Sequence, residues 1–414
     1  MSPEPFPWLG NKRLCIEIGC TAFTGLTLGV GSNTLNDGLS LSASAGVGLM
    51  SGKSGASVGS AFVRTGFAYE AVPGSEGEIV DAYGARWHRG VEGSSLVQAP
   101  LAGADLHAIH AYSPATPRLW LQISDRADMF ELADAPLPGL VASCFALRGG
   151  WSFLEECADR SPIAFALLDW AEEQISSFYI QLIRSLAHDP NLIIYHDELG
   201  TDLSSYFSER DFRDLILPRM RRILERIRST TSAPIGVFIR GSALSALSSV
   251  AELGVAVLGV DCNARGNTVK VLRNLLGYGV VLHGAADLVA LGRALTDGDM
   301  RGTAILASEF AEARPAIAAP SAVLTSDADL SAAARGSSFL SVLDPGDLEV
   351  LGRIGPERRI IERAMMCFPS GVERAPAHVV ALERPRILAP AGALPRHVHM
   401  EMAGSSQADV GGKL

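Results

Sequence analysis

The sequence has 414 residues, of which 48 % are hydrophobic, and its 45 acidic residues outnumber its 35 lysines and arginines, for a net charge of −10 at pH 7. A chain of this length can bury a large core, as one barrel domain or as two smaller domains. The acidic balance argues against a sequence-independent nucleic-acid binder, which needs a basic face. The six cysteines form no Cys-x-x-Cys pair, no signal peptide precedes the first strand, and no apolar run is long enough to span a membrane. We therefore expect a reduced, cytoplasmic protein that binds neither nucleic acid nor membranes.

The first 140 residues give few clear elements. The stretch 13–19 indicates a first strand, and the Gly-, Ser- and Ala-rich stretch 21–59 predicts loops and short helices of small residues. Alternating apolar residues with turn residues between them predict a β-hairpin over about 78–101 that is inserted into the main fold. His107 and His110 follow at helical spacing and indicate an exposed helical turn.

From residue 141 onward, short apolar runs alternate with longer amphipathic segments. The runs predict strands over 141–147, 192–195, 234–239, 255–260, 279–282 and 337–343. The segments between them predict helices over 151–159, 162–187, 208–228, 243–253, 267–276 and 287–295, the third with Ser208 as its N-cap. Such alternation implies parallel strands joined by helical crossovers. We expect an α/β fold with one (β/α)8 TIM barrel over 1–388 and a poorly structured tail over 389–414; a doubly wound sheet is the alternative.

Polar residues at the ends of these strands are the candidate site, because parallel sheets carry their chemistry at the carboxyl ends of the strands. We expect catalytic roles for Asp197, Glu198 and His283. Substrate-binding roles are expected for His196, Asp202, Arg240, Asp261 and Asp287. If the strand continues through Asp197 and Glu198, the two carboxylates point to opposite faces, one toward the barrel lumen and the other toward a helix. The structural alternative is that Asp197 or Asp202 caps a loop or pairs with an arginine such as Arg210.

Several of these stretches, in this order and spacing, resemble the uroporphyrinogen decarboxylase superfamily, which includes the corrinoid-dependent methyltransferases. They are Asp81-Ala-Tyr-Gly-Ala-Arg-Trp87, His196-Asp-Glu-Leu-Gly-Thr-Asp202 with Ser208–Arg213 and Leu217-Pro-Arg219, Ala251–Asp261, and Val280–Asp287. The resemblance covers about residues 13–300 and, more weakly, 337–385. It implies a (β/α)8 barrel, a corrinoid supplied by a partner protein rather than bound tightly by this chain, and a homodimer, as is frequent in the family.

Two departures from the family patterns bear on function. The zinc-dependent methyltransferases carry His-x-Cys-Gly where this chain has Phe238-Ile-Arg-Gly241, so Phe238 and Arg240 replace two ligands. Cys367 corresponds to the third ligand, and one thiolate cannot hold a zinc; we expect no metal site, with His397 and His399 in the tail as a weaker alternative. The arginine-rich segment by which the decarboxylases grip their substrate is also missing, because residues 20–60 contain no arginine.

Three functions remain open at this point. The first is methyl transfer from a small methylated substrate to a corrinoid, with Glu198 or Asp197 protonating the departing oxygen. The second is a decarboxylase or other lyase for a small acid, in which Arg240 holds a carboxylate and Asp197 protonates the carbanion. The third is a barrel that binds a ligand or partner without catalysis.

Overall fold

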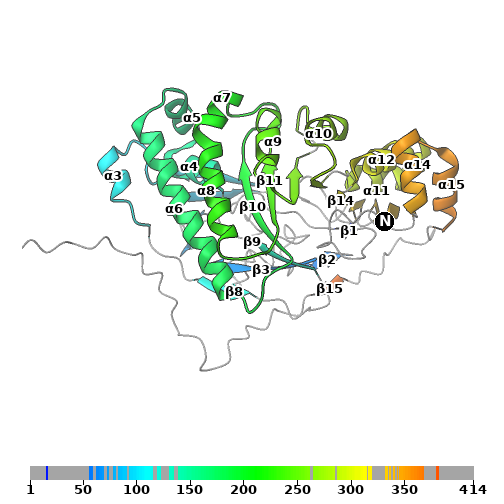
Figure 1. Cartoon of the computed structure of the whole chain (residues 1–414), viewed down its shortest axis with the longest axis horizontal. Helices are drawn as coiled ribbons and strands as arrows, with labels where there is room; N and C mark the ends of the chain where they lie inside the picture. Colours follow the sequence, from blue (N-terminus) through cyan, green and yellow to red (C-terminus); the bar gives the residue numbers. More distant parts are fainter. Residues whose placement is uncertain are drawn as a thin grey trace, which may run out of the picture.

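The structure is a computed structural model of the 414-residue chain (Figure 1). The residues that it describes are 15–16, 56–58, 62–69, 72–73, 78–80, 83–90, 93–114, 119–122, 130–134, 139–261, 264–284, 287–314, 316–318, 332–333, 335–336, 339–340, 343, 345–367 and 379–381. The expected tail over 389–414, including His397 and His399, and nearly all of the small-residue stretch 21–59 lie outside these residues.

The main sheet contains eight strands that are joined by seven parallel pairings. In spatial order they are β3 (Phe62–Tyr69), β9 (Phe130–Asp134), β10 (Leu192–Glu198), β11 (Ile235–Arg240), β12 (Val257–Val260), β13 (Val281–His283), β14 (Ala316–Ala318) and β1 (Cys15–Ile16). This order is the chain order with β1 moved to the end, as in a barrel opened between β1 and β3. No β1–β3 pairing occurs among the described strands, and β8 (Leu119–Gln122) pairs with β3 in antiparallel fashion.

Two smaller antiparallel sheets lie beside the main sheet. Strands β4 (Val72–Pro73), β5 (Glu78–Val80), β6 (Arg86–Gly90) and β7 (Gly93–Gln98) form the first, and its last three strands occupy the residues of the expected hairpin. Strands β2 (Ala56–Val58) and β15 (Val379–Ala381) form the second. The short helix α3 (Leu106–His110) follows the hairpin, and both of its histidines are exposed, as expected.

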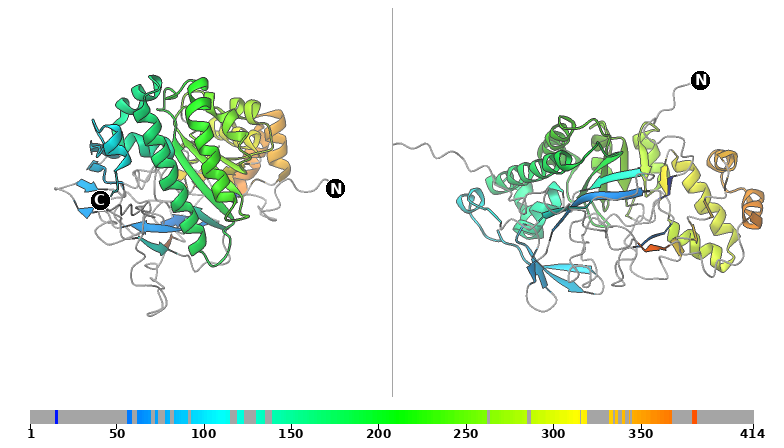
Figure 2. Two further views of the ribbon diagram at one scale, coloured as in Figure 1. Left: turned by 60° about the vertical axis from the view of Figure 1, so that its left-hand side comes forward. Right: turned by 90° about the horizontal axis from the view of Figure 1, so that it is seen from below.

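Helices pack against one face of the sheet, which we call the outer face, and the opposite side is the inner face (Figures 1 and 2). They are α4 (Leu140–Arg148), α5 (Gly150–Ala158), α6 (Pro162–Ser185), α7 (Glu209–Asp211), the π-helix η3 (Phe212–Ile216), α8 (Leu217–Arg228), α9 (Leu244–Ala251) and α10 (Val269–Leu276). A second group consists of α11 (Leu288–Asp297), α12 (Met300–Ala313), α14 (Pro345–Ile354) and α15 (Arg358–Cys367). None of the described helices is long and apolar enough to span a membrane.

The strand residues divide cleanly between the two faces. Alternate residues, Ile193, Tyr195, Val237, Ile239 and Leu258 among them, belong to the large hydrophobic cluster that includes α6 and α8. The residues between them therefore lie on the inner face, because successive side chains of a strand point to opposite sides.

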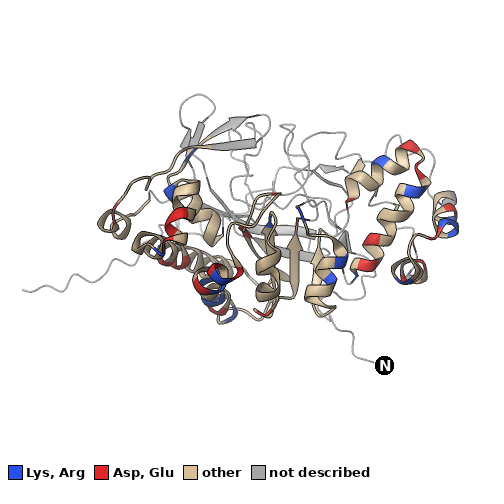
Figure 3. Ribbon diagram, turned by 90° about the horizontal axis from the view of Figure 1, so that it is seen from above, with Lys and Arg blue, Asp and Glu red and all other residues tan. Residues whose placement is uncertain are grey.

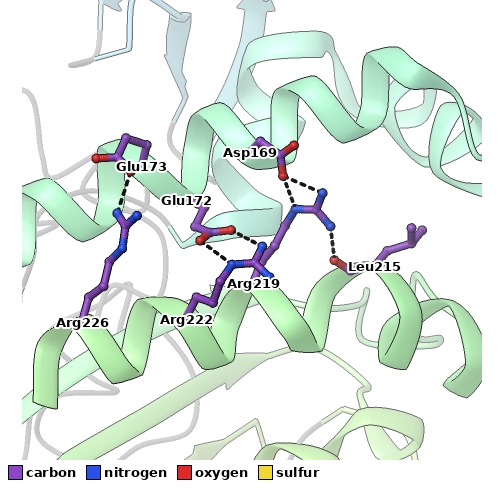
Figure 4. A network of polar contacts seen from close by, with 7 residues as sticks. All are labelled: Asp169, Glu172, Glu173, Leu215, Arg219, Arg222 and Arg226. Carbon is purple, nitrogen blue, oxygen red and sulfur yellow. Dashed lines mark hydrogen bonds and ion pairs between the residues drawn. The ribbon is translucent and has the colours of Figure 1, made fainter.

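Helices α6 and α8 are joined by three ion pairs as well as by apolar packing (Figure 4). Arg219 binds Asp169, Arg222 binds Glu172 and Arg226 binds Glu173, each at a shortest distance of 2.6 Å. In the view of Figure 3 the charged residues of the described part lie mostly on helices. These three arginines of α8 thus form contacts between two helices of the fold.

Two strand predictions are wrong. The run 141–147 forms α4, a helix in which all residues except Phe145 are buried. A helix that is buried on all sides lacks the 3.6-residue period by which a helix is recognised, and a short apolar run is then compatible with either structure. The strand that precedes β10 is instead β9, in a stretch for which no strand was predicted.

The described residues of the stretch 337–343 do not form the expected strand. Phe339 and Leu340 are helical and are buried, with Leu343, in the cluster formed by α11 and α12. Their spacing of one and four residues suits one face of a helix. The strand of this region is β14, which lies in an Ala- and Pro-rich stretch that gives no strand pattern.

Candidate functional site

Asp197 and Glu198 lie on opposite faces of β10, as the alternation predicted. Asp197 is fully buried on the outer face, at the N-terminus of α4. Its carboxylate accepts hydrogen bonds from the backbone N–H groups of Val141 at 3.1 Å, Ala142 at 3.0 Å and Glu198 at 2.9 Å. The hydroxyl of Tyr195 donates a fourth at 2.9 Å.

The position of Asp197 is that of a helix cap. Its oxygens satisfy N–H groups that the first turn of α4 leaves without partners. Gly139 permits this approach, because a Cβ there would lie 2.6 Å from the Asp197 carboxyl carbon. Burial raises the pKa of Asp197 above its usual range, although its four donors act in the opposite direction. This geometry matches the structural alternative and turns Asp197 away from the inner face.

Glu198 points to the inner face, where it meets Arg240 of the neighbouring strand. The two residues are register partners across β10 and β11, and Glu198 Oε2 lies 4.0 Å from Arg240 Nη1. Their side chains are 27 % and 41 % exposed. Asp261 directly follows Val260, whose partner on β11 is Ile239, so the backbone of Asp261 continues the same row on β12.

Tyr206 is a site residue that the sequence did not single out. Its hydroxyl donates a 2.8 Å hydrogen bond to Glu198 Oε1, and its ring stacks on Phe145 of α4 with 5.4 Å between centroids. Burial and then the negative charge of Glu198 raise the pKa of Tyr206, so the hydroxyl keeps its proton at neutral pH. The pair of aromatic residues Tyr206 and Phe207 after Ser204 and Ser205 was the sequence signal at this loop.

A second row of side chains lies beneath the first on the inner face, two residues earlier in each strand. His196 pairs in register with Phe238, Phe238 with Gly259, and Gly259 with His283. The Phe238 ring crosses the space above Gly259 and stacks on the His283 ring, with 4.4 Å between centroids and 29° between planes. The side chains of His196, Phe238 and His283 are each at most 3 % exposed. His196 and His283 therefore form a packed layer below Glu198 and Arg240.

The loops after β10 and β11 are joined, which fixes the ends of both strands. Ser242 N donates to Thr201 O at 2.8 Å, and Ser205 Oγ donates to Ser242 O at 2.7 Å. Gly241 has φ +81°, and a Cβ there would lie 2.0 Å from the carbonyl oxygen of Gly200. The backbone near Glu198 and Arg240 is thus held by short-range contacts rather than left to move freely.

The remaining candidates are not gathered at this point. Asp202 is exposed in the loop after β10, and its carbonyl oxygen accepts from Arg265 N at 2.7 Å. Arg210 lies 3.7 Å from Asp214 and not beside Asp202. Asp287 is the N-cap of α11 and accepts from Ala290 N at 2.9 Å. Asp202 and Asp287 thus make contacts with nearby backbone, Asp202 in a loop and Asp287 as a helix cap.

The inner face does not fit the zinc site of the related methyltransferases. Phe238 offers no donor atom, and Arg240 carries a positive charge where a thiolate would be needed. Cys367 ends α15, in the second group of helices. Among the described residues, no group of three histidine, cysteine or acidic side chains is arranged to hold a metal ion.

Comparisons with known proteins agree with this fold. The family model of uroporphyrinogen decarboxylase matches residues 148–334. A solved structure described as a methyltransferase from Methanosarcina mazei is 17 % identical, with a TM-score of 0.50 over 81 % of this chain and 97 % of that chain. At this identity the likeness concerns the fold alone, and a search of curated proteins gave no match. The resemblance seen in the sequence is thereby confirmed over residues 148–334.

Proposed function

We propose that this chain is a uroporphyrinogen decarboxylase-like enzyme that removes a methyl group from a small methylated substrate and passes it to a corrinoid carried by a partner protein. The observation that carries the proposal is the pair Glu198 and Tyr206, which presents an acid and a hydroxyl on the inner face at the carboxyl end of β10. The fold shared with a methyltransferase supports the reaction class.

We further propose that β1 pairs with β3, so that the eight parallel strands close into a (β/α)8 barrel. The spatial order of the strands supports closure, and β1 would pair with the first half of β3, because the second half, Gly66–Tyr69, pairs with β8. The inner face would then be the lumen, and Glu198 and Arg240 would stand at its mouth, where barrel enzymes carry their active sites.

The chemical requirement is a proton for the departing group. When a methyl–oxygen bond breaks, its electron pair stays on the oxygen, which becomes an alkoxide unless an acid protonates it. Glu198 would supply that proton, and Tyr206 would orient the carboxyl through its hydrogen bond to Oε1. The corrinoid of the partner protein would supply the nucleophile that accepts the methyl group. Asp197 would not serve as the acid, because its carboxyl lies on the other face.

A lyase acting on a small acid is the second candidate, and the presence of Arg240 beside Glu198 favours it. In that reaction Arg240 would hold the substrate carboxylate and Glu198 would protonate the carbanion after carbon dioxide leaves. A third outcome, a barrel that binds without catalysis, remains for the experiment to exclude.

The test uses the full chain with chemically reduced cobalamin and a panel of methyl ethers and methylamines. Methylcobalamin formation is the expected result, and Glu198→Gln should slow it about 100-fold or more, the typical contribution of a general acid. Tyr206→Phe keeps the ring stack and should have a smaller effect. Release of carbon dioxide without cobalamin would replace the proposal with the lyase, and unchanged transfer in Glu198→Gln would refute the role of Glu198.

A further inference from the structure

The guanidinium of Arg240 is used less within the described part of the fold than those of Arg148 and Arg222. Arg148 donates to both oxygens of Glu156 and to two carbonyls, and Arg222 forms a two-bond fork with Glu172. Arg240 makes no hydrogen bond with its side chain to any residue that the structure describes. Its ion pair with Glu198, at 4.0 Å, is the longest among these residues.

An arginine that keeps its donors available while half-exposed at a strand end has the form of an anion-binding group. The guanidinium presents parallel N–H donors that match the two oxygens of a carboxylate. Its place in the chain is the one where the zinc-dependent relatives would carry a cysteine ligand.

The surroundings of Arg240 limit the charge of the anion. Glu198 lies beside it, and the backbone of Asp261 lies in the same row on the next strand. With the Glu198 carboxylate beside the one guanidinium, a dianion is disfavoured, because its second negative charge would lie close to that carboxylate. A monoanion can take the donors of Arg240 and leave its uncharged part toward Glu198.

The layer below limits where that anion can lie. Phe238 is two residues before Arg240 on the same face, and its stack with His283 fills the space under the guanidinium. A ligand at Arg240 therefore rests above this layer, at the level of Glu198 and Tyr206. The acid and the anion anchor would contact the same small molecule.

We infer that the substrate of this site is a small monocarboxylate, whose carboxylate is bound by Arg240 while its reacting group faces Glu198. The inference deepens the proposed function and rests on it for the identity of the site, but it concerns binding alone. Under methyl transfer the substrate would be a methylated acid, and the carboxylate would remain unchanged through the reaction.

Calorimetric titration of the full chain tests this inference without cobalamin. The probes are acetate, methoxyacetate, benzoate and 4-methoxybenzoate, with uncharged 2-methoxyethanol and inorganic phosphate for comparison. At least one carboxylate should bind, and Arg240→Met should weaken it about 10- to 100-fold, as expected for lost charge-assisted hydrogen bonds. Arg240→Lys keeps the positive charge but loses the paired N–H donors of the guanidinium. Its affinity for the carboxylate should lie between those of the wild type and Arg240→Met.

Arg210→Met is the matched control, because Arg210 is 85 % exposed on α7 and its loss should leave carboxylate binding unchanged. Equal affinity of the wild type and Arg240→Met for the carboxylate would overturn the inference. So would phosphate binding more tightly than every carboxylate, or no carboxylate binding to the wild type. A chain that binds a methoxy acid through Arg240 but forms no methylcobalamin would refute methyl transfer and leave the inference intact.

Discussion

Replacing Asp197 by asparagine tests whether this buried carboxylate stabilises the fold as a helix cap. In the wild type the two oxygens accept four hydrogen bonds, three from backbone N–H groups and one from Tyr195. Asparagine keeps one oxygen and places an NH₂ group where the other was. That group donates, so it faces donors at the N-terminus of α4 and leaves some of them without acceptors.

The magnitude follows from the bonds that are lost. Two of the four bonds end at the replaced oxygen, and hydrogen bonds to a charged group contribute about 1.5–3 kcal/mol each. Asparagine avoids the cost of burying a charge, which recovers part of that sum. We expect Asp197→Asn to lower the free energy of unfolding by about 2–4 kcal/mol, within the range for broken buried networks.

Urea denaturation measures the change, with the exposed Asp202→Asn as control at about 0.5 kcal/mol or less. A loss below about 1 kcal/mol for Asp197→Asn would refute the capping role. The pH dependence gives a second check. Because the pKa of Asp197 is raised in the folded protein, its protonation on acidification stabilises the fold. The stability difference between wild type and variant should therefore grow as pH falls through the folded pKa, and level off near the ordinary aspartate value of about 4.

Two further substitutions test the packing around the site and the helix contact, both by urea denaturation. Gly259→Ala would place a Cβ 2.6 Å from the Phe238 ring and force it from its stack, which should cost about 1–3 kcal/mol. Gly279→Ala is the control, because a Cβ at Gly279 would have no neighbour within 4 Å, and it should lower the free energy of unfolding by less. Equal losses in the two variants would contradict this account of the packing. Arg222→Met removes both hydrogen bonds from the mostly buried Glu172 and should cost about 1–3 kcal/mol. A variant as stable as the wild type would show that this pair only balances its own desolvation.

The sequence predicted the central strands because their apolar runs are short and their ends carry turn residues. Strands β10 to β13 and the helices between them lie where the pattern placed them. The wrong strand over 141–147 has a clear cause, since α4 is buried so completely that no polar side marks it as a helix. Burial on all sides is set by tertiary packing, which local periodicity does not record.

The sequence predicted that the candidate residues lie at strand ends. It did not predict which face of the sheet each side chain lies on or which residues it contacts. Alternation alone assigned Asp197 and Glu198 to opposite faces, and the packing of α4 decided which one faces the helices. Tyr206 could not be foreseen, because its contact with Glu198 depends on how the loop after β10 folds back onto the strand. Asp287 was predicted to bind substrate because it follows the end of a strand, and in the structure it also caps α11.

The replacement of the zinc ligands involves more than two positions. A phenylalanine at 238 needs room on the inner face, and Gly259 on the next strand supplies it, since a Cβ there would lie 2.6 Å from the ring. The ring in turn rests on His283, so three adjacent strands share one packed layer. Restoring histidine at 238 alone would leave a cavity in that layer, with Arg240 still directing a positive charge at the same face. The inner face thus differs from the zinc pattern in its packing as well as in two side chains, since Phe238, Gly259 and His283 fit one another.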